Sequence, residues 1–203
     1  FLTYSYVCID SEAWNANKSF EDIKYNFVKY ANFLPADNSA DLELDNSTIF
    51  SEWKYAKMGF SKQGVVLFAS SNDINNFTEL PSKFENEYFY TYILNLYKKI
   101  YLKKLENNFK NSSNLKETRK KFIEFTKNLW NQDITDDEIG SKINFKIIKN
   151  FELDRLYDEI KTKYDVLYKE LNIEKNSKAI MIVAVILVVS LIFNILNYIE
   201  MAH

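Results

Sequence analysis

The sequence contains few of the residue types on which catalysis and phosphate binding usually depend. Among 203 residues there are one cysteine, one histidine and three glycines. Isolated glycines at 59, 64 and 140 form no glycine-rich phosphate loop, and the only histidine, His203, excludes zinc sites and histidine-dependent triads. A single thiol, Cys8, has no intramolecular partner, and we expect Cys8 to lie in the core of a cytosolic domain. The sequence therefore predicts that the protein is not an enzyme.

Basic residues are nearly all lysines, and they alternate with acidic residues along the chain. The 26 Lys and Arg residues against 28 Asp and Glu residues give a net charge of -2, and only Arg119 and Arg155 are arginines. Nucleic-acid-binding proteins usually carry clustered positive charge, and guanidinium groups are the preferred ligands of phosphate. The composition therefore argues against nucleic acid as a partner and against phosphoryl transfer.

One long stretch near the C-terminus contains no charged residue. Residues 179–199 are uncharged, and about twenty apolar residues in a helix suffice to cross the hydrocarbon core of a bilayer. Its position after a long hydrophilic segment distinguishes it from a cleaved signal peptide. Lys169, Lys175 and Lys178 precede it. By the positive-inside rule, this asymmetry predicts a span in the cell membrane with the N-terminal domain in the cytoplasm.

The remaining sequence predicts an α+β fold in which strands come first. Residues 2–9 indicate a strand, and a helix from Ser19 to Leu34 follows, with a buried face that includes Tyr30. Residues 53–60 and 65–70 indicate a hairpin, in which Gly64 is expected to supply a positive φ. We expect an α/β block at 1–81, a helical region at 82–150, a stalk at 151–178, the transmembrane helix at 179–199 and a tail at 200–203.

Helical periodicity dominates from about Ser82. Its first helix carries a broad apolar stripe that indicates packing in the core or against a neighbouring subunit, rather than a ligand cage. The stripe consists of Phe84, Tyr88, Tyr92, Leu96 and Ile100, with Phe89, Ile93, Tyr97 and Tyr101 beside them. A second helix is expected to end at Trp130. Thr135 and Glu138 form a capping-box signature that is expected to open a third helix.

The predicted stalk carries apolar residues at intervals of three and four, the spacing of a coiled-coil seam. If the stalk continues unbroken into the span, it forms a helix roughly 70 Å long at 1.5 Å per residue. So small a domain is not expected to cover such a helix, and the seam therefore predicts a homo-oligomer. The seam residues are Leu153, Leu156, Ile160, Tyr164, Leu167 and Leu171.

Polar residues interrupt the predicted span on one side. Ser190, Asn194 and Asn197 are spaced four and three residues apart, which places them on one helix face. Polar side chains are costly in hydrocarbon and usually face a bundle interior or water. Two interpretations are equally consistent with this face: hydrogen bonds between helices of an oligomer, and the lining of a pore.

Acidic residues gather at two places. Asp133, Asp136, Asp137 and Glu138 surround a predicted helix start, and Asp154 and Asp158 lie on the stalk. Carboxylates of adjacent subunits could share a hard cation such as Mg²⁺. Helix capping and a solvated helix face explain the same residues, and we favour that interpretation.

Four stretches resemble the CorA-like family of divalent-cation channels, in particular its divergent bacterial members. They are residues 55–68, 89–97, 122–140 and 153–160. The resemblance implies a cytoplasmic α/β block, a stalk that continues into the first membrane helix, and homopentamers in which this helix lines the pore. The family's Gly-Met-Asn motif and second span do not follow here, so we expect the sequence to be a fragment.

The leading functional hypothesis is an oligomeric subunit of an ion channel or transporter, with Mg²⁺ as the transported or regulatory ion. The alternative is a membrane-anchored sensor or effector whose cytoplasmic domain binds a small-molecule regulator or a partner. Some CorA-like relatives occur in antiviral defence, which supports that alternative. A third hypothesis is a tail-anchored structural protein. No other cofactor is expected, and the predicted partners are the lipid bilayer and further copies of the chain.

Overall fold

The computed structural model describes residues 2–12, 14, 21–32, 48–62, 64–111, 115–132, 135 and 137–201. It confirms the α+β class, with a four-stranded sheet followed by helices and a long C-terminal helix. The chain divides into two compact units, Phe1–Tyr157 and Asp158–His203. The α/β block and the helical region therefore belong to the same unit, and the division falls inside the last helix rather than at its start.

The sheet combines a hairpin with a strand from the beginning of the chain. Its strands are β1 (Thr3–Ile9), β2 (Ile49–Phe50), β3 (Ala56–Phe60) and β4 (Gly64–Ser70), in the spatial order β1-β4-β3-β2. β3 is antiparallel to both β2 and β4, whereas β1 is parallel to β4. The predicted first strand and hairpin are confirmed. The two-residue β2 was not predicted.

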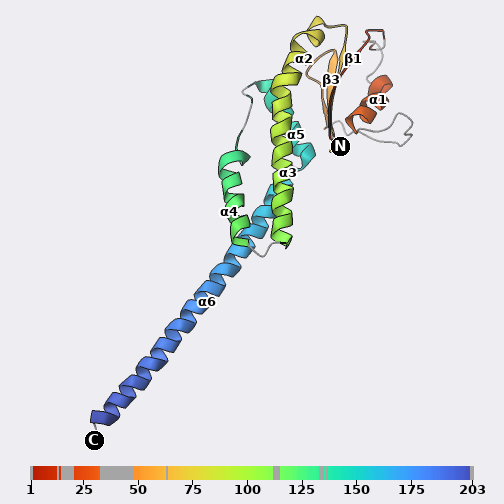
Figure 1. Ribbon diagram of the computed structural model, residues 1–203. Helices are drawn as coiled ribbons and strands as arrows, with labels where there is room; N and C mark the ends of the chain where they lie inside the picture. Colours follow the sequence, from red (N-terminus) through yellow and green to blue (C-terminus); the bar gives the residue numbers. More distant parts are fainter. Residues whose placement is uncertain are drawn as a thin grey trace. The chain divides into compact units, whose positions relative to one another are not determined.

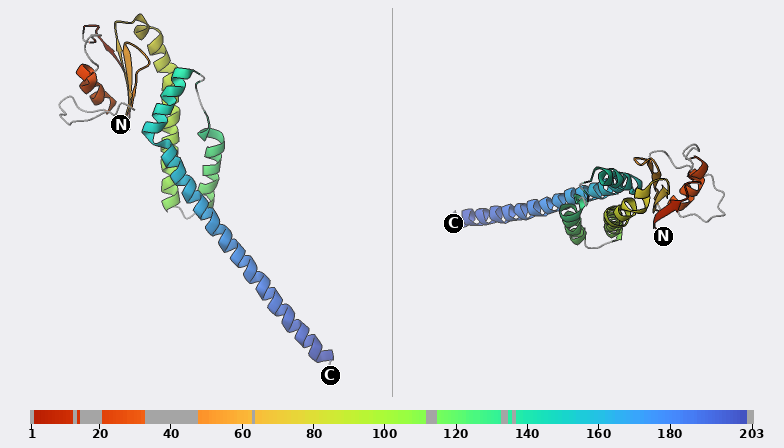
Figure 2. Two further views of the ribbon diagram at one scale, coloured as in Figure 1. Left: turned by 180° about the vertical axis from the view of Figure 1, so that it is seen from behind. Right: turned by 90° about the horizontal axis from the view of Figure 1, so that it is seen from above.

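Helices cover both faces of the sheet, and all seven residues of β4 are buried as a result. On one face lies α1 (Glu21–Ala31), whose Phe27 and Ala31 join Val66 and Phe68 in a core cluster. Figures 1 and 2 show α1 on one side of the strands and the α2–α3 helix on the other. Tyr30 was predicted on the buried face of α1. It is 51% exposed, and Val28 is buried instead.

The second face of the sheet packs against one continuous helical stretch. It consists of α2 (Glu79–Lys83), the π-helical turn η3 (Phe84–Tyr88) and α3 (Phe89–Asn111), and it follows the short 3-10 helix η2 (Ile74–Phe77). The ring of Tyr4 stacks on Phe84 with centroids 4.0 Å apart, and its hydroxyl donates a hydrogen bond of 2.7 Å to the carbonyl oxygen of Phe84. Aromatic packing thus fixes β1 on the helix.

Gly59 and Gly64 are required because neighbouring atoms leave no room for a side chain, and not because of their backbone conformation. A Cβ at Gly59 would collide with the ring of Phe27, and a Cβ at Gly64 would lie 2.6 Å from the backbone oxygen of Thr3. No glycine described has a positive φ. The prediction that Gly64 supplies a positive φ is therefore wrong. A larger residue does not fit at position 64, because β1 pairs directly beside it.

The remaining helices of the first unit are α4 (Leu115–Phe125), the π-helical turn η4 (Thr126–Trp130) and α5 (Glu138–Phe151). These confirm the second and third predicted helices. The N-cap of α5 is Asp137, whose carboxylate accepts a 3.0 Å hydrogen bond from the backbone N–H of Gly140. Thr135 was predicted to begin the capping box. Instead, its hydroxyl donates to the carboxylate of Glu87 in η3, which ties the start of α5 to the long helix.

A buried lysine joins α3 to the end of η4. Lys98 is 4% exposed, and its ammonium donates hydrogen bonds of 2.9 Å to the carbonyl oxygens of both Trp130 and Gln132. These carbonyls lie at the C-terminal end of a helical segment, where the helix dipole favours a positive charge. The buried ammonium of Lys98 is thus stabilised by hydrogen bonds that join the two helical segments.

The burial of Cys8 differs from the prediction. Cys8 lies in a strand, as expected, but it is exposed rather than buried in the core. The other six residues of β1 are half-buried, so the exposure is confined to Cys8.

Candidate functional site

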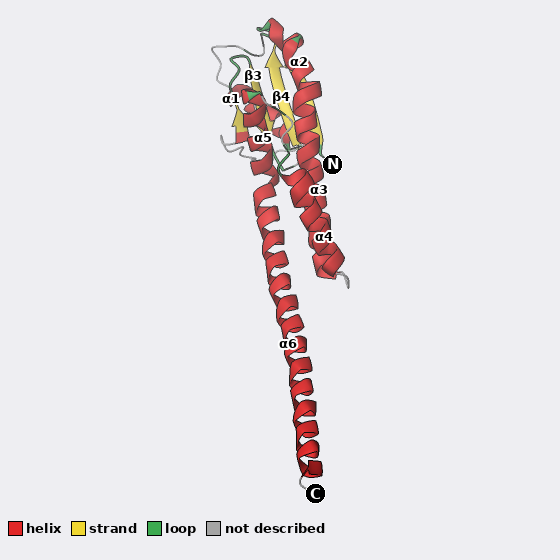
Figure 3. Cartoon of the chain, turned by 90° about the vertical axis from the view of Figure 1, so that its left-hand side faces the viewer, coloured by secondary structure: helices red, strands yellow, loops and turns green. Residues whose placement is uncertain are grey.

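The C-terminal helix α6 extends from Leu153 to Met201 without interruption. Figure 3 shows it as a single helix, which confirms the predicted continuity of stalk and span. At 1.5 Å per residue, its 49 residues extend about 73 Å. Among the described helices, α6 is the one that is long and apolar enough to cross a membrane, judged by length and composition.

The apolar part of α6 is exposed throughout its described length. From Ile180 to Phe193, every large apolar side chain is between 47% and 70% exposed. Transfer of one such side chain from water to an apolar environment contributes about 1.5–3 kcal/mol, so the whole segment gains on the order of 20 kcal/mol. That gain exceeds the net stability of a typical domain. Transfer of this segment to an apolar environment is therefore strongly favourable.

The polar face of this segment contains two described side chains. Ser190 and Asn194 are both exposed and lie one helical turn apart. The third predicted member, Asn197, belongs to α6, but its side chain lies outside the described residues. An amide and a hydroxyl on one face can donate and accept hydrogen bonds with matching groups or water.

The first half of the predicted oligomer seam is buried in the single chain. Leu153, Leu156 and Ile160 are buried within a single chain, with Ile160 1% exposed. These three side chains are therefore covered without a second copy. Tyr164 and Leu167 are half-buried. The side chain of Leu171 lies outside the described residues.

Within the described part of the chain, no group of three or more candidate metal ligands comes together. Asp137 caps α5 and lies 3.9 Å from the ammonium of Lys83, and Glu138 pairs with Lys142. Asp154 and Asp158 are exposed on α6. Capping explains Asp137, as favoured from the sequence. Asp133 and Asp136 lie outside the described residues.

Burial raises the pKa of Tyr88, and the nearby carboxylates of Asp137 and Glu87 raise it further. The phenol of Tyr88 is therefore neutral throughout the physiological range. Its ring belongs to the core between the sheet and the helices, and it is not available as a base or nucleophile.

The junction between α5 and α6 is held by a charged cluster. Glu152 has a left-handed backbone with φ 56°, which ends α5 and lets α6 begin at the next residue. Its carboxylate lies 2.5 Å from the ammonium of Lys62 and 2.5 Å from the guanidinium of Arg155. Hydrogen bonds from Lys62, which has the larger effect, and from Arg155 lower the pKa of the Glu152 carboxyl to about 2.

Replacing Glu152 with glutamine is expected to make stability less dependent on pH. Because the folded-state pKa of Glu152 is depressed, its contribution is present above the unfolded-state pKa of about 4.3 and is lost as the pH falls toward 2. Urea denaturation of both proteins should show a small difference at pH 7 that disappears near pH 2. The cluster is exposed, so the difference should be modest. A constant difference at all pH values would contradict this assignment.

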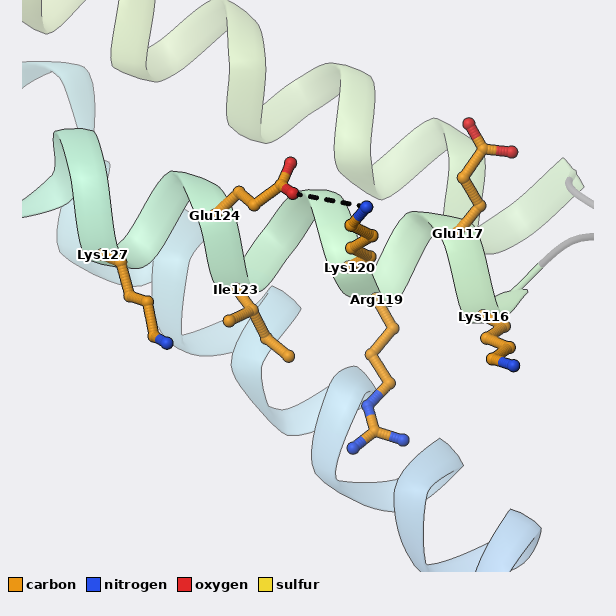
Figure 4. Close-up of a pocket in the computed structure, with 7 residues that line it drawn as sticks. All are labelled: Lys116, Glu117, Arg119, Lys120, Ile123, Glu124 and Lys127. Atoms are coloured by element: carbon orange, nitrogen blue, oxygen red, sulfur yellow. Dashed lines mark ion pairs between the residues drawn. The ribbon is translucent and has the colours of Figure 1, made fainter.

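A shallow basic surface lies along α4 (Figure 4). Its lining combines cations with Ile123 and two carboxylates, and Lys120 and Glu124 lie 3.8 Å apart. Arg119 and Lys127 point to the side of α4 opposite Glu117 and Glu124. The lining residues are Lys116, Glu117, Arg119, Lys120, Ile123, Glu124 and Lys127. Because carboxylates intersperse these cations, the surface lacks the concentrated positive charge typical of phosphate sites.

A second groove lies between β2 and α5. Lys142 crosses it, with its ammonium 3.2 Å from Glu52 and 3.0 Å from Glu138. Phe145 lines the groove and is 65% exposed. No local pattern predicts this groove, because Glu52 and Lys142 are ninety residues apart.

Comparisons with protein-family models, with curated proteins and with solved structures find no match to this chain.

Proposed function

We propose that this chain is a membrane-spanning subunit of a homo-oligomer that conducts ions. The helix α6 is anchored in the bilayer, and the face that carries Ser190, Asn194 and Asn197 lines the conduction path. The proposal extends the CorA-like resemblance, with Mg²⁺ as the first ion to test and a pentamer as the expected assembly. It rests chiefly on one observation: an uninterrupted helix whose apolar segment is exposed on every described side chain.

The position of the charges on α6 supports the proposed orientation. Lys178 is the last charged residue before the uncharged segment, and its ammonium forms an ion pair of 2.7 Å with Glu174. The next twenty-one residues carry no charge. Lysines on the N-terminal side of the span favour a cytoplasmic location for the first unit.

The polar face supports self-association. A lone helix in lipid would leave Ser190 and Asn194 exposed to hydrocarbon, since both side chains are exposed in the single chain. Assembly of several copies around a common axis would bring these side chains together and hydrate them. Symmetric rings of this kind are a common solution for ion pathways.

The test is ion flux through the purified chain in liposomes. Vesicles that contain the protein and an impermeant Mg²⁺ indicator should respond to external Mg²⁺ faster than protein-free vesicles, and the protein in mild detergent should have the mass of an oligomer. Absence of flux from an oligomeric, membrane-inserted preparation would contradict conduction. A monodisperse monomer would contradict the assembly.

A sensor or effector is the second candidate, and the groove between β2 and α5 is the observation that favours it. A ligand there would contact Phe145 and compete for the ion pairs of Lys142. In this case the span would serve as an anchor. Membrane insertion without flux, together with ligand-dependent quenching at Trp53 near the strand β2, would favour this candidate.

A further inference from the structure

An apolar stripe on α3 is exposed in the single chain. It consists of Phe89, Tyr90, Ile93, Tyr97 and Ile100, whose side chains are between 36% and 58% exposed. Phe84, Tyr88 and Tyr92 of the same stretch are buried against the sheet, so only half of the predicted aromatic stripe is used inside the chain. Contiguous apolar faces of this kind on soluble domains usually mark interaction sites.

Two charged residues bracket this stripe at the same spacing. Glu85 lies four residues before Phe89, and Lys104 lies four residues after Ile100. Both are exposed, and within the described part of the chain no ion pair joins either of them to another residue. The stripe is therefore acidic at its N-terminal end and basic at its C-terminal end.

We propose that this stripe binds the same stripe of a second copy in an antiparallel arrangement. Glu85 then faces Lys104 of the second copy, and Lys104 faces Glu85 in return. Phe89 meets Ile100, and Ile93 meets Tyr97. All of these pairs are centred on the same turn of the helix, so a single register satisfies both the charges and the apolar contacts.

The arrangement is favoured over a parallel one by electrostatics. A parallel pair would place Glu85 opposite Glu85 and Lys104 opposite Lys104, and like charges facing each other are unfavourable. Antiparallel helices also align their dipoles favourably. The interface lies on the first unit and involves no residue of α6. It therefore goes beyond the proposed conduction. Because a two-fold pair cannot repeat around a ring of five copies, the pair forms between copies of different rings rather than within one ring.

Disulfide crosslinking of the full chain in detergent tests the arrangement. In a Cys8→Ser background, Glu85→Cys and Lys104→Cys chains with different tags are co-expressed and oxidised. The mixed pair should crosslink, while each variant alone should give at least about fivefold less product, because an antiparallel register keeps identical positions roughly 28 Å apart along the helix. One Glu85–Lys104 ion pair remains intact in the mixed pair.

Charge reversal provides the second measurement. Glu85→Lys alone and Lys104→Glu alone should each weaken dimerisation about tenfold, because each creates two repulsive contacts across the two-fold axis. The double variant Glu85→Lys, Lys104→Glu should restore association to within about twofold of the parent chain. Lys103→Glu, which changes the charge of the next residue on an adjoining face, is the matched control and should have little effect.

Circular dichroism of each variant separates loss of pairing from loss of folding. A folded chain without the mixed crosslink overturns the proposal. Lipid or a different protein would then be the binding partner of the stripe. Crosslinking of Glu85→Cys to itself overturns the antiparallel register. Failure of the double reversal to restore association overturns the role of the charges.

Discussion

Replacing Asn194 with leucine is expected to abolish ion flux in liposomes while the oligomer remains assembled. Asn194 is exposed in the single chain, and Ser190 lies one turn before it on the same face. If copies of this face surround a pore, leucine creates an apolar ring at a narrow point, and such a ring can exclude water. The measurement is flux and oligomer mass on the same preparation.

Two control variants sharpen this experiment. Asn194→Ser keeps a polar group at the position and should retain flux. Ile192→Leu changes a neighbouring apolar residue of α6 and should leave both readouts unchanged. If Asn194 only forms hydrogen bonds between helices, Asn194→Leu should weaken assembly by roughly 0.6–2 kcal/mol without a specific effect on flux. Unchanged flux with unchanged assembly would contradict both roles.

Replacing Lys98 with alanine is expected to lower the free energy of unfolding by about 3 kcal/mol. The substitution removes the donor to the carbonyl oxygens of Trp130 and Gln132, and it leaves a cavity between α3 and η4. A loss of this size is a large part of the stability of a typical domain. Urea denaturation of the detergent-solubilised chain, followed by tryptophan fluorescence, measures it.

Lys103→Ala is the matched control for this variant. Lys103 lies on the same helix and is exposed, so its replacement should change stability by no more than about 0.5 kcal/mol. Lys98→Met keeps the apolar volume but removes the donor, and it should fall between the two. Equal stabilities of Lys98→Ala and Lys103→Ala would contradict the structural role of Lys98.

Local sequence patterns predicted the elements of the fold better than their pairing. The aromatic and β-branched runs at residues 53–60 and 65–70 indicated a hairpin, because a short connection that contains Gly64 joins them. The parallel pairing of β1 with β4 was not predictable from periodicity, because the two strands are separated by about sixty residues. It depends on the close approach of Thr3 to Gly64, which no local pattern records.

Apolar spacing predicted which residues share a helix face but not what covers that face. Leu156 and Ile160 have the spacing of an oligomer seam, yet both are buried in the single chain. Ile93 and Tyr97 have the same kind of spacing, yet both remain exposed. Likewise, nothing in the sequence distinguishes Lys98, which is buried, from Lys99, which is half-buried. Burial depends on the packing of distant segments, and periodicity carries no information about it.

The most direct test of the account is whether α6 places its two ends on opposite sides of a membrane. Cys8 is exposed, and burial of part of its surface raises the pKa of its thiol, so labelling is best performed above neutral pH. In intact cells an impermeant maleimide should label a Cys8→Ser, His203→Cys chain. The same reagent should label the native Cys8 only after lysis. Labelling of both positions in intact cells, or release of the protein from membranes by alkaline carbonate, would contradict the account.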